Sequence, residues 1–158
     1  MISVLFVCLG NICRSPAAEG VLRHLVNKQG RSDLFHIQSC GIGDWHVGHL
    51  PDERMRDSAK NRGVVLASRA QIFKYEFFDQ FDYIFAADHE ILNLLYQHAA
   101  SSEQKTKIHL MTVYSPCYPN EEIVDPFYQG RGDFERVLDI LEDACEGFLN
   151  YLTKQNKI

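Results

Sequence analysis

An apolar run over residues 2–7 leads directly into a short loop that opens with Cys8 and closes with Arg14. A run of this kind, with one polar residue in six, is typical of a strand buried on both faces. Gly10 permits a tight loop backbone, and the Ser-Pro pair at 15–16 favours a helix start with the serine as N-cap. Because loop N–H groups and a helix N-terminus converge in such an arrangement, it predicts a site for an anion.

The two ends of this anion loop (residues 8–14) carry reactive groups. Arg14 can hold two oxygens of a tetrahedral anion with its planar guanidinium, which a lysine cannot do. Inward N–H groups, the helix N-terminus and Arg14 all favour the thiolate of Cys8, which would then be a nucleophile directed at the anion. A buried cysteine ending a core strand, with an arginine on a helix surface, fits the same spacing. The residues expected to surround the anion are Leu9, Gly10, Asn11, Ile12 and Cys13.

Strand and helix patterns alternate along the whole chain, which predicts an α/β fold. The expected strands cover 2–8, 35–39, 82–87 and 107–111, and the expected helices cover 16–28, 51–62, 90–99 and 134–152. We therefore expect one domain over residues 1–158, with an open parallel sheet of about four strands and helices on both faces. Ligands bind beyond the carboxyl ends of strands in such sheets, and Cys8 ends the first strand.

Composition excludes several other classes of function. A net charge of −5 without a basic cluster counts against nucleic-acid binding, and no apolar run approaches the length of a membrane span or a signal peptide. Five cysteines at irregular spacing favour free thiols and a cytoplasmic protein. We expect no metal and no cofactor, since Asp44, His46 and His49 lie in a Gly-rich loop without further ligands.

Four segments of the chain resemble the low-molecular-weight protein tyrosine phosphatases, and their order and spacing fit from end to end. They are residues 4–19, 41–48, 51–54 and 123–127. The resemblance implies hydrolysis of protein phosphotyrosine through a phosphocysteine intermediate, with Cys8 as nucleophile, Arg14 as transition-state stabiliser and Asp125 as general acid and base. It also implies a phosphoprotein partner, such as a tyrosine kinase, inhibition by inorganic phosphate or other oxyanions, and a monomer.

The resemblance also assigns roles that local sequence leaves open. Asp125 precedes a proline in a loop, where an aspartate is most often a turn former. Asn11 and Ser15 are implied to hydrogen-bond and hold the anion loop, although Ser15 is equally explained as an N-cap. Cys13 is implied to form a reversible disulfide with Cys8, whereas a small apolar side chain under the loop fits as well.

Aromatic side chains near the expected site are candidate walls for a substrate ring. Trp45, Phe127 and Tyr128 lie on loops, and a deep cup between such rings favours phosphotyrosine over the shorter phosphoserine. Trp45 is also explained as a half-buried loop anchor. The family often has tyrosine at the position of Phe127, and residues 88–90 depart from its usual acidic residue followed by Ser or Asn.

Two other functions fit part of the pattern. Arsenate reduction shares this fold and loop, but it requires two further cysteines close together, and the remaining ones are dispersed at Cys40, Cys117 and Cys145. A silent phosphate-binding module would not require Cys8, Arg14 and Asp125 together.

Overall fold

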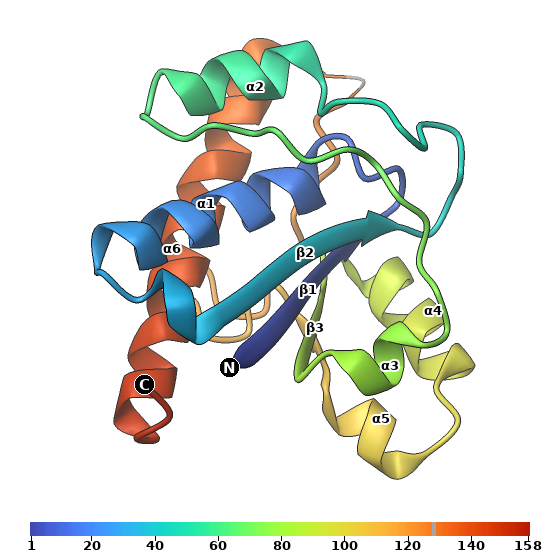
Figure 1. Ribbon diagram of the computed structural model, residues 1–158. Coiled ribbons are helices and arrows are strands. Elements are labelled where there is room, and N and C mark those ends of the chain that lie inside the picture. The colour runs from blue at the N-terminus through green and yellow to red at the C-terminus, as the bar shows by residue number, and fades with distance from the viewer. Residues whose placement is uncertain (128) are drawn as a thin grey trace.

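The first strand, β1 (Ile2–Cys8), lies inside a parallel sheet, between β2 (Phe35–Gly41) and β3 (Tyr83–Ala86). A fourth strand, β4 (Ile108–Leu110), pairs with β3, so the order is β2-β1-β3-β4 (Figure 1). This is a computed structural model, and it describes residues 1–127 and 129–158. The order places a topological switch point beside β1, where its loop and the loop after β3 diverge.

Helices cover both faces of the sheet, as predicted (Figure 1). Two long helices, α1 (Arg14–Lys28) and α6 (Arg131–Lys154), pack against each other on one face, and α2 (Glu53–Lys60) contacts α6. The other face carries α3 (Phe77–Gln80) and α4 (His89–His98), while α5 (Ser102–Thr106) precedes β4. The structure is therefore a single-domain α/β fold of the class expected from the sequence.

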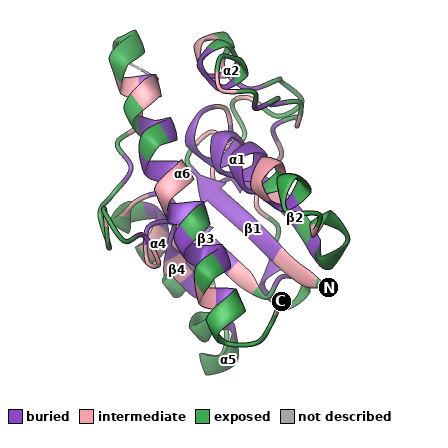
Figure 2. Cartoon of the chain, turned by 90° about the vertical axis from the view of Figure 1, so that its left-hand side faces the viewer, coloured by how far each residue is buried: buried purple, intermediate pink, exposed green. Residues whose placement is uncertain are grey.

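Alternate side chains of β1 enter two different hydrophobic cores. Val4 and Phe6 pack with residues of α1 and α6, whereas Leu5 and Val7 pack with residues of α3 and α4. This is why the strand reads as a continuous apolar run, and Figure 2 shows it buried over most of its length. The double burial fixes the direction of the strand, and with it the place where Cys8 emerges.

Three local predictions differ from the structure. Ser15 is not an N-cap, because α1 begins at Arg14 after Cys13 and makes no side-chain cap bond; the serine hydroxyl lies against the Cys8 sulfur instead. The helix predicted over 51–62 covers only Glu53–Lys60, and Gly63 just beyond it has a left-handed φ of 80°. The short helices α3 and α5 were not predicted, since four or five residues show no helical period.

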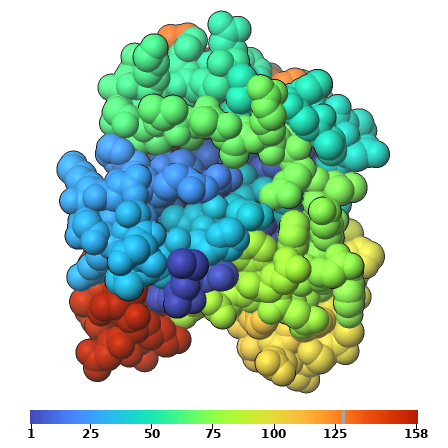
Figure 3. Space-filling model, in the orientation of Figure 1, coloured from blue at the N-terminus to red at the C-terminus, as the bar shows by residue number. Residues whose placement is uncertain are grey.

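The segment after α2 crosses α1 and ends beside the anion loop. In Figure 3 it is the green strip that runs over the blue α1. A Cβ added to Gly20 of α1 would lie 2.2 Å from Leu66 Cδ2, so the glycine allows this close crossing without a shift of the Leu66 side chain. Further along, the Gln71 N–H donates to Asn11 Oδ1 at 3.0 Å. The segment thus supports the anion loop from the side of β2.

Candidate active site

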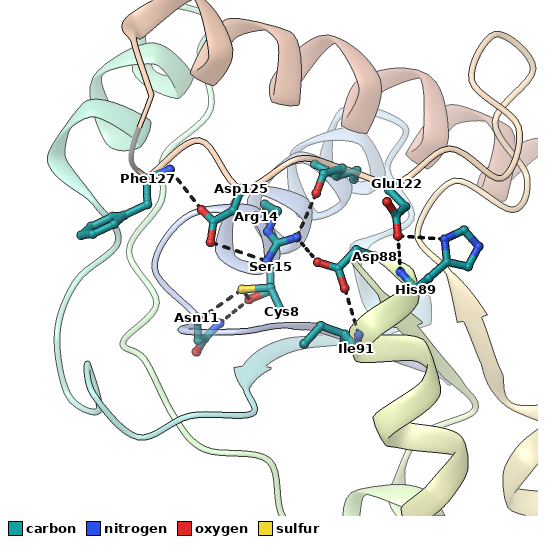
Figure 4. Close-up of polar contacts among 11 residues, drawn as sticks. Cys8, Asn11, Arg14, Ser15, Asp88, His89, Ile91, Glu122, Asp125 and Phe127 are labelled. Atoms are coloured by element: carbon teal, nitrogen blue, oxygen red, sulfur yellow. Dashed lines mark hydrogen bonds and ion pairs between the residues drawn. The ribbon is translucent and has the colours of Figure 1, made fainter.

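The anion loop curls around the sulfur of Cys8 at the end of β1 (Figure 4). The Asn11 N–H donates to Cys8 Sγ at 3.3 Å, and Ser15 Oγ lies 2.9 Å from the same sulfur. Asn11 has a φ of 56°, in the left-handed region that few residues other than glycine and asparagine adopt. A buried sulfur with two polar partners is placed where a thiolate would be stabilised.

Asn11 holds the loop through every polar atom of its side chain. Its Nδ2 donates to Ser15 Oγ at 2.7 Å and to Ser39 Oγ at 3.0 Å, while its Oδ1 accepts the Gln71 N–H. Ser39 in turn donates to Glu19 Oε1 at 2.6 Å. The expected bond between Asn11 and Ser15 is present, and it belongs to a larger network that ties the loop to β2 and α1.

The guanidinium of Arg14 is buried and held in place by two acceptors. Its Nη1 donates to Asp88 Oδ2 at 2.6 Å and to the carbonyl of Ile123 at 2.9 Å. Asp88 also accepts the Ile91 N–H at 2.9 Å as the N-cap of α4. Both of these hydrogen bonds use Nη1; Nη2 is 3.6 Å from an Asp125 carboxylate oxygen, so Nε and Nη2 are placed to donate to an anion.

Asp125 lies on the other side of the same guanidinium, in the segment 121–127 (the Asp125 loop). Its Oδ2 is 3.6 Å from Arg14 Nη2, and its Oδ1 accepts the Phe127 N–H at 3.0 Å. The side chain is 37% exposed, so water reaches it. Although burial opposes it, the nearby Cys8 sulfur and the carboxylates of Asp88 and Asp125 raise the pKa of Arg14.

A cavity of about 380 Å³ opens in front of the anion loop. Trp45 is 64% exposed, and its ring lies so close to Gly43 that a Cβ there would clash at 1.9 Å. Tyr128 lies outside the described residues. The structure therefore brings most of the expected site residues together around one cavity, lined by Cys8, Leu9, Gly10, Ile12, Cys13, Arg14, Trp45, His46, Asp125 and Phe127.

Sequence reasoning missed His46 as a cavity residue, having considered it only as a metal ligand. Its ring would be 3.1 Å from a Cβ placed on Gly10, and its centroid is 6.1 Å from that of Phe127. Among the described residues, no group of three His, Cys, Asp or Glu side chains could hold a metal ion. The ring forms one wall of the cavity together with Trp45 and Phe127.

Cys13 lines the same cavity as a free and buried thiol. Burial raises its pKa far above the ordinary value, and the negative charges of Asp52, Asp125 and Cys8 act in the same direction. Cys13 is therefore protonated at neutral pH, and its pairing with Cys8 stays a prediction. The other cysteines are also free, with Cys40 and Cys145 buried and Cys117 exposed.

The fold and the site together define a class of α/β protein, in which a cysteine and an arginine enclose an anion loop at the switch point of a parallel sheet. Within this class, the chain belongs to the low molecular weight phosphotyrosine protein phosphatase family, whose model matches residues 3–158. The family expected from the sequence is thereby confirmed. None of the described helices is both long and apolar enough to cross a membrane.

Curated relatives and solved structures resemble the chain over almost its full length. The low molecular weight phosphotyrosine protein phosphatase of Sus scrofa is 40% identical over 93% of each chain, and the low molecular weight protein-tyrosine-phosphatase of Bacillus subtilis is 35% identical over 100% of each. The structure of a protein tyrosine phosphatase from Entamoeba histolytica, with Hepes in its active site, matches with a TM-score of 0.93, 37% identity and 100% coverage of both chains. A Drosophila protein described as an arginine phosphatase matches with a TM-score of 0.86 and 36% identity, over 94% of this chain and 96% of that one.

Proposed function

We propose that this phosphatase hydrolyses protein phosphotyrosine to tyrosine and inorganic phosphate through a phosphocysteine intermediate. The observation that carries the proposal is that Cys8, Arg14 and Asp125 line one cavity, with Arg14 between two carboxylates. The names of the relatives point to the same substrate class. A catalytically silent module would not require a nucleophile, an anion-binding guanidinium and a proton donor in one cavity.

In the first step, the Cys8 thiolate attacks phosphorus, and the bond between phosphorus and the tyrosine oxygen breaks. The Asn11 N–H and the Ser15 hydroxyl stabilise the thiolate before the attack. The loop N–H groups of residues 9–13, together with Nε and Nη2 of Arg14, bind the three phosphoryl oxygens as their charge redistributes. Asp88 keeps Nη1 occupied, which orients the other two nitrogens toward the anion.

Asp125 transfers a proton in both steps, as an acid in the first and as a base in the second. Protonated Asp125 gives its proton to the leaving phenolate, which would otherwise depart as a poor leaving group. The resulting carboxylate then takes a proton from a water molecule that attacks the phosphocysteine, so that the bond between sulfur and phosphorus breaks and phosphate is released. The partial exposure of Asp125 gives that water access to the site.

The shape of the cavity favours an aromatic phosphate ester. Leu9 and Ile12 supply apolar surface, and the rings of Trp45 and Phe127 can pack against a phenyl ring. A phosphorylated guanidino group would need several hydrogen-bond acceptors for its N–H groups, and Asp125 is the one carboxylate among the described side chains that line the cavity. The phosphoprotein substrate is the expected partner, and inorganic phosphate should compete with it for the anion loop.

We expect the purified protein to dephosphorylate a phosphotyrosine peptide and p-nitrophenyl phosphate fully in the presence of EDTA, because no step uses a metal. Phosphoserine should be cleaved at least about tenfold more slowly, since its short side chain cannot reach the aromatic walls while its phosphate is bound. Phosphoarginine is the comparison suggested by the Drosophila relative. A preference for phosphoarginine would replace the proposed substrate, and arsenate reduction without ester hydrolysis would replace the reaction.

Replacing Asp125 with alanine should reduce the rate most for substrates whose leaving group must be protonated as it departs. The loss should be about 10²-fold or more for tyrosine and small for activated phenols. The wild-type rate should fall at high pH as Asp125 loses its proton, so the variant should lack this basic limb. The measurement is kcat/KM against pH for a series of aryl phosphates.

Glu121→Ala is a matched control for this measurement, because it removes an exposed carboxylate from the same loop. It should leave both the pH profile and the leaving-group dependence unchanged. An equal loss for all leaving groups in Asp125→Ala, with an unchanged profile, would show that Asp125 only supports the loop. Asp88, which also pairs with Arg14, would then be the next proton donor to test.

A further inference from the structure

Arg54, in the first turn of α2, connects the anion loop to the Asp125 loop. Its Nε and Nη2 bind the two carboxylate oxygens of Asp52 at 3.1 and 3.0 Å. Asp52 is itself fixed to the anion loop, because its N–H donates to the carbonyl of Ile12 at 2.7 Å. Burial opposes ionisation of Asp52, but its hydrogen bonds to Arg54 outweigh it and lower the pKa of this carboxyl. The pair is therefore charged at neutral pH and geometrically fixed.

The same guanidinium also holds the Asp125 loop. Nη2 of Arg54 donates to the carbonyl of Phe127 at 2.9 Å. The guanidinium lies over the rings of Phe127 and Phe134, at 5.7 and 4.6 Å from their centroids, and Phe134 is fully buried at the start of α6. Arg54 is thus in contact with α6 and with the end of the Asp125 loop at once, and it cannot move without disturbing both.

Two anchors flank Asp125 along the chain. On one side, the Ile123 N–H donates to the carbonyl of Ala87 at 2.9 Å, and the Ile123 carbonyl accepts from Arg14. On the other side, the Phe127 N–H donates to Asp125, and the Phe127 carbonyl accepts a hydrogen bond from Arg54. Between these anchors, Val124 is 65% exposed and Asp125 is 37% exposed. The second anchor therefore decides where the carboxyl of Asp125 lies relative to Cys8.

We propose that Arg54 is a positioning residue for proton transfer, which fixes the Phe127 peptide and thereby holds the Asp125 carboxyl at the leaving-group oxygen. This rests on the proposed function of Asp125. Arg54 does not itself line the cavity. A displacement of about 1 Å is enough to remove most of the benefit of an oriented catalytic group. The loss of Arg54 should therefore resemble the loss of Asp125 in kind and be smaller in size.

The test compares Arg54→Met, which keeps the apolar stem, with Arg54→Lys, which keeps the charge and one hydrogen bond. For phenyl phosphate, kcat/KM should fall about tenfold to 100-fold in Arg54→Met and less in Arg54→Lys. For an activated phenol such as p-nitrophenol it should fall less than about threefold, and the basic limb of the pH profile should flatten. Inhibition by inorganic phosphate should stay within about twofold of wild type, because the anion loop is intact. Lys60→Ala, an exposed charge on the same helix, should change none of these quantities.

A double variant separates positioning from a general structural role. If Arg54 acts through Asp125, then Arg54→Met combined with Asp125→Ala should be no slower than Asp125→Ala alone. Additive losses, or an equal loss for all leaving groups, would overturn the proposal. If thermal unfolding shows that Arg54→Met is not folded, the same comparison of single and double variants is made with Arg54→Lys, and its result decides the proposal.

These outcomes also separate the two proposals. A wild-type protein that cleaves no aryl phosphate would overturn the proposed function and this role together. A wild-type protein with a normal leaving-group dependence, beside an Arg54→Met variant identical to it, would overturn only the positioning role.

Discussion

Cys8→Ser should abolish turnover, with a loss of about 10³-fold or more, and leave both the fold and anion binding intact. A serine hydroxyl stays protonated at neutral pH, so the nucleophile is lost. The Asn11 N–H and the Ser15 hydroxyl can still bond the new oxygen, and the Arg14 donors are unchanged. Steady-state rates with p-nitrophenyl phosphate give the loss, and phosphate titration by calorimetry gives the retained affinity.

Cys117→Ser is the control for Cys8→Ser, because it makes the same atomic change at an exposed cysteine away from the cavity. It should keep wild-type activity. More than a few per cent of activity in Cys8→Ser would remove Cys8 from its role. A variant that loses phosphate binding together with activity would show that the sulfur also shapes the loop.

Arg14→Lys should be nearly as damaging as Cys8→Ser, although it keeps the positive charge. An ammonium cannot bond Asp88, the Ile123 carbonyl and two phosphoryl oxygens at once in the geometry of the planar guanidinium. The loss of a bidentate contact to the transition state should reduce kcat by about 10²–10³-fold. The inhibition constant for inorganic phosphate should also rise, because the Arg14 guanidinium binds the phosphate product as well.

Arg31→Lys, at a half-buried position just beyond α1, makes the same chemical change without contact to the cavity and should leave the kinetics unchanged. Normal kinetics in Arg14→Lys would contradict the proposed geometry, in which two nitrogens of one planar group hold the anion. A drop in thermal stability alone, with unchanged kinetics, would assign Arg14 to the ion pair with Asp88 only.

The fold could be predicted because its strongest signals are long and local. The strand predicted over 2–8 and the helix predicted over 134–152 each occupy many residues, and both are confirmed as β1 and α6. The anion loop was predicted for the same reason, since its residues are contiguous between Cys8 and Arg14. The error at Ser15 arose because one hydroxyl suits both a helix cap and a contact to sulfur, and local sequence does not choose between them.

The supporting residues outside the anion loop could not be predicted, because their contacts join distant parts of the chain. Asp88 and Arg14 are 74 positions apart in the sequence, and Arg54 and Phe127 are 73 positions apart. These contacts depend on the strand order, which places the end of β3 beside the end of β1. An acidic residue directly after a predicted central strand was the available signal for Asp88. For Arg54, only its place in a resembling segment was visible.

The conformation of Asn11 limits how this chain can change over evolutionary time. Its φ of 56° is a backbone requirement that glycine would meet with ease. Its three side-chain hydrogen bonds are a second requirement, which glycine cannot meet, and aspartate cannot donate to the two serines that Nδ2 now serves. Few amino acids meet both demands, so one point mutation here would both loosen the loop and leave Ser15 and Ser39 without a donor. Any drift at this position would have to be accompanied by changes in β2 and in the segment that carries Gln71.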